Sequence, residues 1–270
     1  MSGSVIHSQS AAMVPAVSSA GQSPQLPVAI DYPAALALRQ MSMVHDELPK
    51  YLLAPEVSAL LHYVPDLRRK MLLATLWNTG ARINEALALT RGDFSLAPPY
   101  PFVQLATLKQ RTEKAARTAG RTPAGQQTHR LVPLSDSWYV SQLQTMVATL
   151  KIPMERRNKR TGRTEKARIW EVTDRTVRTW IGEAVAAAAT DGVTFSVPVT
   201  PHTFRHSYAM HMLYAGIPLK VLQSLMGHKS ISSTEVYTKV FALDVAARHR
   251  VQFAMPESDA VAMLKQLSSE

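Results

Sequence analysis

The chain has 270 residues, a formal net charge of +10 and a pI near 9.9. Its length allows one large or two small domains, and the absence of cysteine excludes disulfides, thiolate catalysis and cysteine-based zinc sites. No apolar run approaches the roughly 18–20 residues of a membrane span. The N-terminus lacks the basic start of a secretory signal, so we expect a cytoplasmic protein with no membrane partner.

The first fifty residues predict little regular structure. Residues 1–30 are rich in Ser, Ala, Gln and Pro and contain no Asp, Glu, Lys or Arg, which is typical of a disordered leader. Residues 31–50 predict a short helical segment over Tyr32–Met43. From Tyr51 the composition changes to that of a folded domain.

The remaining chain predicts a mainly α fold with a small antiparallel β-sheet, which is an α+β class. Strand-like runs at Phe102–Leu108 and His129–Leu134 flank a polar, basic connection, which predicts a hairpin with a long tip. Apolar residues recur at helical spacing, or cap and stop signals occur, in the following segments: Glu56–Leu61, Asp66–Trp77, Arg82–Leu89, Val140–Leu150, Arg175–Ala189 behind a capping Asp174, Thr200–Tyr214, Pro218–Met226, a helix opened by a Ser232/Glu235 capping box, Ala242–Phe253 and Ser258–Leu267.

Positive charge is concentrated in one part of the chain. Residues 105–168 hold fourteen Lys or Arg against four acids, which equals the whole excess of +10. Within this part, residues 154–168 have no apolar face and predict an exposed hairpin or loop. Duplex DNA suits such segments because neutralised phosphates release counterions, although charge alone also fits RNA or acidic lipid. The residues expected to contact DNA are Arg111, Lys114, Arg117, Arg121, Arg156, Arg157, Lys159, Arg160 and Arg163.

The stretch from residue 200 to 240 holds the residues with the clearest chemistry. His202 and Arg205 lie one helical turn apart and share a helix face. His228 follows a glycine that ends a helix, and Tyr237 lies nine residues later. His206 is interpreted as packing or as support for the site.

These side chains suit phosphoryl transfer through a protein nucleophile. Arg205 and Arg82, in the segment TGARINEALAL, can clamp a phosphate and stabilise its added charge. A phenol with a pKa near 10 needs a base or positive surroundings, which the arginines and His202 are expected to give Tyr237. A structural alternative for Arg82 is an ion pair with Glu85. We expect no metal site, because cysteine and H-E-x-x-H spacing are both absent.

Taken together, T-G-x-R-x-x-E, H-x-x-R, L-x-G-H and the following tyrosine resemble the tyrosine recombinase (phage integrase) family over about residues 51–255. The resemblance implies DNA cleavage through a 3′-phosphotyrosine, without metal or cofactor. It implies a lysine in the first hairpin that protonates the leaving 5′-hydroxyl, for which Lys109 is the first choice and Lys114 the second. The implied catalytic residues are Arg82, Lys109, His202, Arg205, His228 and Tyr237.

The resemblance also implies an organisation and partners. Residues 51–255 form the catalytic domain, residues 31–50 form a short helical N-terminal segment and no full core-binding domain, and residues 256–270 form a helix that docks into a neighbouring subunit. The implied partners are double-stranded DNA with inverted-repeat sites, a homo-tetramer on that DNA, and accessory DNA-bending proteins. The sequence also resembles plasmid-encoded resolvases of this family, which implies plasmid multimer resolution. A non-catalytic DNA-binding accessory protein and a type IB-like topoisomerase remain alternatives.

Overall fold

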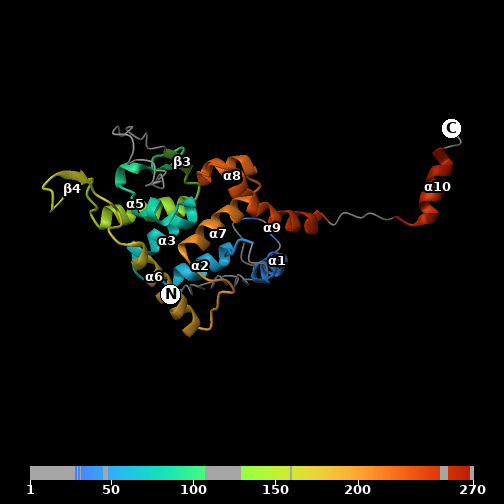
Figure 1. The fold of residues 1–270 in the computed structure, drawn as a ribbon, viewed down its shortest axis with the longest axis horizontal. Coiled ribbons are helices and arrows are strands. Elements are labelled where there is room, and N and C mark those ends of the chain that lie inside the picture. Colours follow the sequence, from blue (N-terminus) through green and yellow to red (C-terminus); the bar gives the residue numbers. More distant parts are fainter. Residues whose placement is uncertain are drawn as a thin grey trace, which may run out of the picture.

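The computed structural model describes residues 28, 30, 32–44, 48–106, 129–158, 160–249 and 255–267. Helices form most of this part of the chain, which confirms the mainly α prediction (Figure 1). They are α1 (Tyr32–Val44), α2 (Ala54–His62), α3 (Leu67–Thr79), α4 (Ile83–Leu87), the 3-10 turn η1 (Arg91–Asp93), α5 (Ser137–Thr149), α6 (Asp174–Thr190), α7 (Pro201–Tyr214), α8 (Leu219–Met226), α9 (Ser232–His249) and α10 (Glu257–Leu267).

Two small antiparallel sheets complete the fold. The strands β1 (Phe94–Ser95), β2 (Phe102–Ala106) and β3 (His129–Pro133) form the first sheet, in that order. Val103 of β2 pairs with Val132 of β3, and both side chains are buried, which confirms the predicted hairpin. Its tip lies outside the described residues. The second sheet pairs β4 (Glu155–Arg157) with β5 (Thr164–Lys166) as the predicted exposed hairpin, which extends from one side of the molecule (Figure 1).

Helix α7 links the two hydrophobic clusters of the core. Phe204 packs with α2, α3, α5, α6 and the first sheet, whereas Tyr208 and Met210 pack with α8, α9 and the N-terminal segment. Thr200 caps α7 through a hydrogen bond from the Thr203 amide, and proline follows at the first helical position, as predicted. Because α7 contributes to both clusters, its polar side chains are fixed relative to the whole domain.

Two helix ends next to α7 require glycine. Gly80 ends α3 with a φ of +58°, and a Cβ there would lie 2.3 Å from the ring of Tyr208. Gly227 ends α8 with a φ of +63°, and a Cβ would lie 3.0 Å from the Arg130 side chain. Both turns leave helix C-terminal carbonyl groups available to other donors.

The structure corrects several predicted boundaries. Thr173, not Asp174, caps α6, because its hydroxyl accepts the hydrogen bond from the Thr176 amide. Ser232 is the first residue of α9, and this helix continues to His249 without a break. The two-residue strand β1 is too short to give a periodic pattern. Within the described residues, no helix has both the length and the apolar character of a membrane span.

Candidate active site

Residues from several separate elements line one cavity of about 540 Å³. They come from the start of α4, from α6, from the first turns of α7, from the turn after α8 and from α9. Five of the six predicted catalytic residues are among them: Arg82, His202, Arg205, His228 and Tyr237. The sixth, Lys109, lies outside the described residues, as does the second-choice Lys114.

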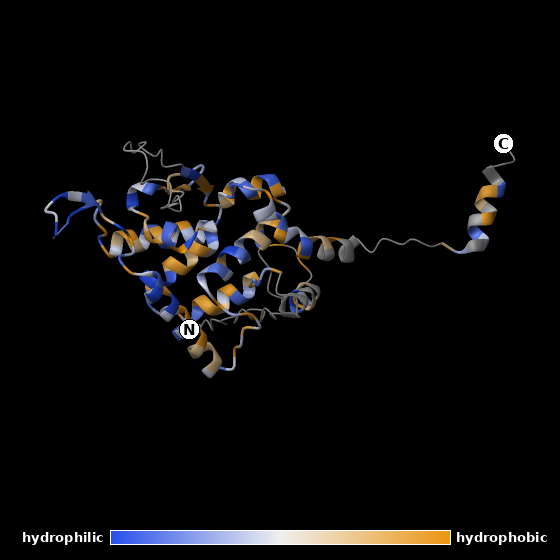
Figure 2. Cartoon of the chain, in the orientation of Figure 1, coloured by the Kyte–Doolittle hydropathy of each residue, from blue (hydrophilic) through white to orange (hydrophobic). Residues whose placement is uncertain are grey.

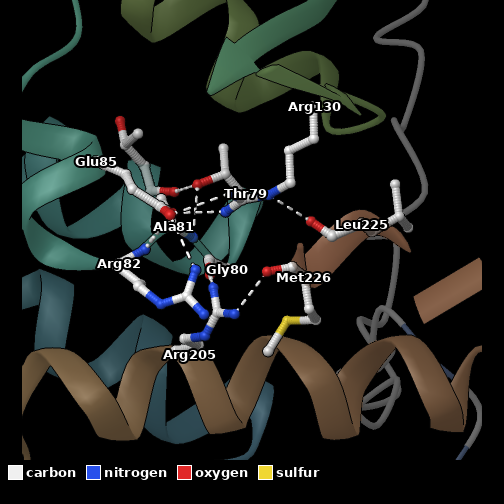
Figure 3. A network of polar contacts seen from close by, with 10 residues as sticks. Thr79, Gly80, Ala81, Arg82, Glu85, Arg130, Arg205, Leu225 and Met226 are labelled. Carbon is white, nitrogen blue, oxygen red and sulfur yellow. Dashed lines mark hydrogen bonds and ion pairs between the residues drawn. The ribbon is translucent and has the colours of Figure 1, made fainter. Parts of the chain in front are cut away.

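Two helix ends anchor the Arg205 side chain (Figure 3). Arg205 is 4% exposed, and its Nη groups donate to the carbonyl oxygens of Gly80 (2.5 Å) and Met226 (2.6 Å). These groups lie at the C-terminal ends of α3 and α8, which carry partial negative charge. Burial and the charges of Arg82 and Arg130 lower the pKa of Arg205 to about 10, so the guanidinium is charged at neutral pH. Arg205 keeps further N–H donors for an anion in the cavity.

The buried Glu85 carboxylate joins the half-exposed Arg82 and the buried Arg130 in one network (Figure 3). Its carboxylate accepts hydrogen bonds from Arg82 (3.0 Å) and from both Nη groups of Arg130 (3.2 and 2.6 Å). Arg130 Nε also donates to the Leu225 carbonyl (2.8 Å). Burial raises the pKa of Glu85, but the hydrogen bonds and charge of Arg130 and the hydrogen bonds of Arg82 outweigh it and hold that pKa below its usual value. The structural ion pair foreseen for Arg82 is therefore present, and Arg82 also lines the cavity.

The surroundings of the histidines at the cavity favour the neutral form of each ring. The ring of His202, exposed on the first turn of α7, lies 4.2 Å from the ring of His206. Nδ1 of His228 lies 2.8 Å from the Thr234 hydroxyl. Burial and nearby arginine charges lower the pKa of both His202 and His228, the latter to about 4. In the part of the chain that the structure describes, no three His, Asp or Glu side chains group as ligands for one metal ion.

Tyr237 is covered in this structure. Its side chain is 2% exposed, and its hydroxyl lies 2.9 Å from Nδ1 of His206. The expectation that positive surroundings activate the phenol is wrong for this form of the protein. Burial outweighs the charges of Arg205 and Arg82 and raises the pKa of Tyr237 to about 12. The phenol is therefore protonated at neutral pH.

The basic residues expected to contact DNA fall only partly within the described chain. Arg156, Arg157, Arg160 and Arg163 belong to the β4–β5 hairpin, which Figure 2 shows as strongly hydrophilic. Arg156 is paired with two glutamates, one of them Glu165 at 2.8 Å, whereas Arg160 and Arg163 are exposed at the turn. The others lie outside the described residues: Arg111, Lys114, Arg117, Arg121 and Lys159.

A family model described as "Phage integrase family" matches residues 50–243. The chain belongs to this family, the tyrosine recombinases. A protein of Escherichia coli K12 named "Resolvase" is 96% identical over 268 residues, which cover 99% of this chain and 100% of that protein. A "Probable site-specific recombinase in afa region" of Escherichia coli is 48% identical over 90% of this chain and 92% of that protein. The family assignment made from the sequence is confirmed.

Solved structures of tyrosine recombinases share the fold at low sequence identity. The crystal structure of XerA recombinase matches 76% of this chain and 65% of that chain, with a TM-score of 0.53 and 20% identity. A post-cleavage complex of XerH with palindromic difH substrate gives a TM-score of 0.53 and 18% identity. This tyrosine recombinase chain spans about half of the XerH chain, 53% by that match.

Local sequence patterns do not identify several supporting residues of this candidate site. Arg130 and Arg178 were not singled out, although Arg130 binds Glu85 and Arg178 lines the cavity. His206 was assigned only to packing or support, yet it contacts the predicted nucleophile. Arg130 and Glu85 are 45 residues apart, and His206 and Tyr237 are 31 apart, so no local pattern links them. Only the fold brings these partners together.

Proposed function

We propose that this chain is a site-specific recombinase that cuts and rejoins duplex DNA through a covalent bond between Tyr237 and a DNA 3′-phosphate. The main support for this proposal is that five residues from distant parts of the chain line one cavity: Arg82, His202, Arg205, His228 and Tyr237. Membership of the phage integrase family supports the same function.

In the proposed reaction, the cavity holds the scissile phosphate. The N–H groups of Arg82 and Arg205 donate hydrogen bonds to the non-bridging oxygens of this phosphate. These oxygens gain negative charge as the fifth bond to phosphorus forms. The bond from phosphorus to the Tyr237 oxygen forms, the bond to the 5′ oxygen breaks, and an acid protonates that oxygen. Lys109 is the proposed acid, and Lys114 is the second choice. A 5′-hydroxyl from another DNA end then attacks the phosphotyrosine and releases Tyr237, so that no metal or nucleotide is required.

Tyr237 must be uncovered before it can react in this way, with its hydroxyl remaining beside His206. A phenol that is 2% exposed cannot reach a phosphate on a duplex, so this structure corresponds to a resting form in the proposed cycle. His228 lies before α9 and its ring contacts Thr234 on the first turn of that helix. We infer that a phosphate bound at His228 displaces this turn and uncovers Tyr237.

The proposed partner is double-stranded DNA with inverted repeats, bound by a homo-tetramer together with accessory DNA-bending proteins. The net charge of +10 and the exposed hairpin arginines support DNA binding. Helix α10 stands apart from the other helices (Figure 1), with Val261, Met263 and Leu264 51–64% exposed, which supports docking onto a neighbouring subunit. The near-identical relative named "Resolvase" supports a role in plasmid multimer resolution.

A nicked suicide duplex tests the nucleophile. The recognised site is first selected by binding from a random duplex library and then nicked next to the scissile phosphate, so that cleavage traps the covalent adduct. We expect the wild-type chain to form this adduct with EDTA present, and Tyr237→Phe to bind the duplex without forming it. Tyr208→Phe is the matched control, because Tyr208 is also buried yet does not line the cavity.

The outcomes separate the proposal from its rivals. An adduct with Tyr237→Phe would assign the nucleophile to another residue. Binding without any adduct in the wild-type chain would favour the accessory protein. Efficient relaxation of supercoiled plasmids that lack the selected site would favour the topoisomerase. Loss of cleavage in EDTA that magnesium restores would contradict the metal-free mechanism.

A further inference from the structure

We propose that His206 is the proton acceptor for Tyr237, so that its Nδ1 takes the phenolic proton as the tyrosine oxygen attacks the scissile phosphorus. This inference rests on the proposed function and names the base in its first step. It departs from the sequence-based expectation, in which His202 and the arginines activate the phenol.

The geometry favours His206 over the other histidines at the cavity. Nδ1 of His206 lies 2.9 Å from the Tyr237 hydroxyl, and the two rings meet edge to face at a centroid distance of 5.5 Å. Of the side chains that the structure describes, His206 is the one that hydrogen-bonds to this hydroxyl. His202 contacts the His206 ring, whereas the Nδ1 of His228 lies against Thr234. A base must lie within hydrogen-bond reach of the proton that it removes.

The surroundings of His206 keep it available as an acceptor. Burial and the positive environment lower the pKa of His206 to about 3, so the ring is neutral and one ring nitrogen has a free lone pair. With the phenol as donor, that nitrogen is Nδ1 and the remaining proton is on Nε2. The titratable and charged groups that line the cavities beside His206 are His202 and Arg205 on α7, Tyr237 on α9, His228 after α8, Arg82 before α4, Glu85 on α4, Arg178 on α6 and Lys50 before α2.

A bound phosphate would lower the cost of the proton transfer. In the empty cavity, burial and the charges of His202, Arg205 and His228 oppose protonation of His206, and burial keeps Tyr237 protonated. The negative charge of a phosphodiester offsets the arginine field, which raises the proton affinity of His206. At the same time, the forming bond to phosphorus acidifies the phenol. The phenolic proton moves to Nδ1, and the 5′ oxygen takes its proton from a separate acid, so the step is balanced. His206 therefore acts as a base only when substrate is present.

The test compares single-turnover cleavage of the suicide duplex by His206→Ala and His206→Asn. The asparagine amide can occupy the position of Nδ1 and hydrogen-bond to the phenol, but it cannot take a proton. We expect both variants to cleave at least ~100-fold more slowly than the wild-type chain near neutral pH, in line with the loss of a general base. In both, log rate should rise by about one per pH unit as solvent takes over the proton removal. Added imidazole should accelerate His206→Ala and not His206→Asn, in which the space is filled.

The controls separate chemistry from folding and from the nucleophile assignment. His211→Ala is the matched variant, because His211 is also half-buried on α7 and contacts Trp77, away from the cavity. Duplex binding and thermal unfolding are measured for all variants, and if His206→Ala does not fold, His206→Asn carries the test. Wild-type rates in His206→Asn would overturn the proposal and leave His206 as a positioning residue. An adduct in Tyr237→Phe would instead show that the proposed nucleophile is wrong.

Discussion

The substitution Arg130→Met tests whether the buried network holds the site together. Arg130 makes two hydrogen bonds to the Glu85 carboxylate and one to the Leu225 carbonyl. Methionine has a long apolar side chain without charge, so the change removes all three bonds. The buried carboxylate then keeps Arg82 as its ion-pair partner.

The burial of Glu85 and Arg130 determines how large the loss of stability should be. The side chain of Glu85 is 0% exposed and that of Arg130 is 8% exposed, so water cannot replace the lost donors. Removing one partner of a buried ion pair costs about 3–5 kcal/mol. Because Arg82 still neutralises part of the charge, we expect the lower end, about 3 kcal/mol, in the free energy of unfolding. At about 2–4 °C per kcal/mol for a domain of this size, Tm should fall by roughly 6–12 °C.

Thermal unfolding of a double-mutant cycle with Glu85→Gln is the assay. The double variant has no carboxylate at position 85, so no buried charge lacks its Arg130 partner. The loss of stability in the double variant should therefore be smaller than the sum of the two single losses by at least ~1 kcal/mol. Arg91→Met is the matched control, because Arg91 donates to the Ile152 carbonyl (2.8 Å) without an ion pair in the described chain. Its loss should stay below ~1.5 kcal/mol. Equal Tm changes for Arg130→Met and Arg91→Met, or an additive cycle, would refute the reasoning.

Acid should reduce the difference in the free energy of unfolding between the wild-type chain and Arg130→Met. The pKa of Glu85 is held below its usual value, so its contribution to stability is present above the ordinary glutamate pKa and is lost as pH falls through the lowered one. Urea unfolding at several pH values measures this. A difference that stays constant in acid would contradict the ion-pair explanation.

Further predictions concern charge, DNA affinity, assembly and acid stability. Arg205→Lys should slow single-turnover cleavage by at least ~100-fold, because the planar fork is lost while the charge remains. Changing three exposed hairpin arginines to Gln should weaken duplex binding and flatten the slope of log K against log salt by about 0.9 per lost contact. These are Arg157, Arg160 and Arg163. Truncation after Met255 should leave single-site binding but abolish synapsis on native gels with two sites. Because the pKa of His206 is lowered to about 3 and that of His228 to about 4, both rings stay neutral in the folded chain at pH values where they bind protons in the unfolded chain. Its free energy of unfolding should therefore be fully retained above the ordinary histidine pKa and fall as pH drops towards about 4.

The fold was predictable where local chemistry determines it. Thr200 and the following proline predict the start of α7, and Gly227 predicts the end of α8, because caps and left-handed turns act within a few residues. The pairing of β2 with β3 was also predictable from two strand-like runs. The choice of Thr173 over Asp174 as a cap was not, because both residue types cap well and packing decides the register.

The residue types of the candidate site were predictable from the sequence. The burial, the pKa values and the hydrogen-bond partners of these residues were not. A family pattern points to Arg205 and Tyr237, and both line the same cavity. The same pattern gives no information on burial, which raises the pKa of Tyr237 and lowers that of His206. It also does not show that helix ends supply the acceptors for Arg205, since Gly80 and Met226 act through their carbonyl groups. Any residue can supply a carbonyl, so sequence identity carries no signal there.

The charge balance of the cavity explains why an empty site is stable yet prepared for phosphate. Arg82, Arg130 and Arg205 bring three positive charges close together, and Glu85 brings one negative charge, which leaves a positive excess of two, since Arg178 at the cavity is paired with Asp174. Helix C-terminal carbonyls at Gly80 and Met226 offset part of this excess with partial charges. A phosphodiester adds one negative charge, and its pentacoordinate transition state carries a second. The excess is therefore matched more fully by the transition state than by the bound substrate, which is the condition for catalysis rather than for binding alone.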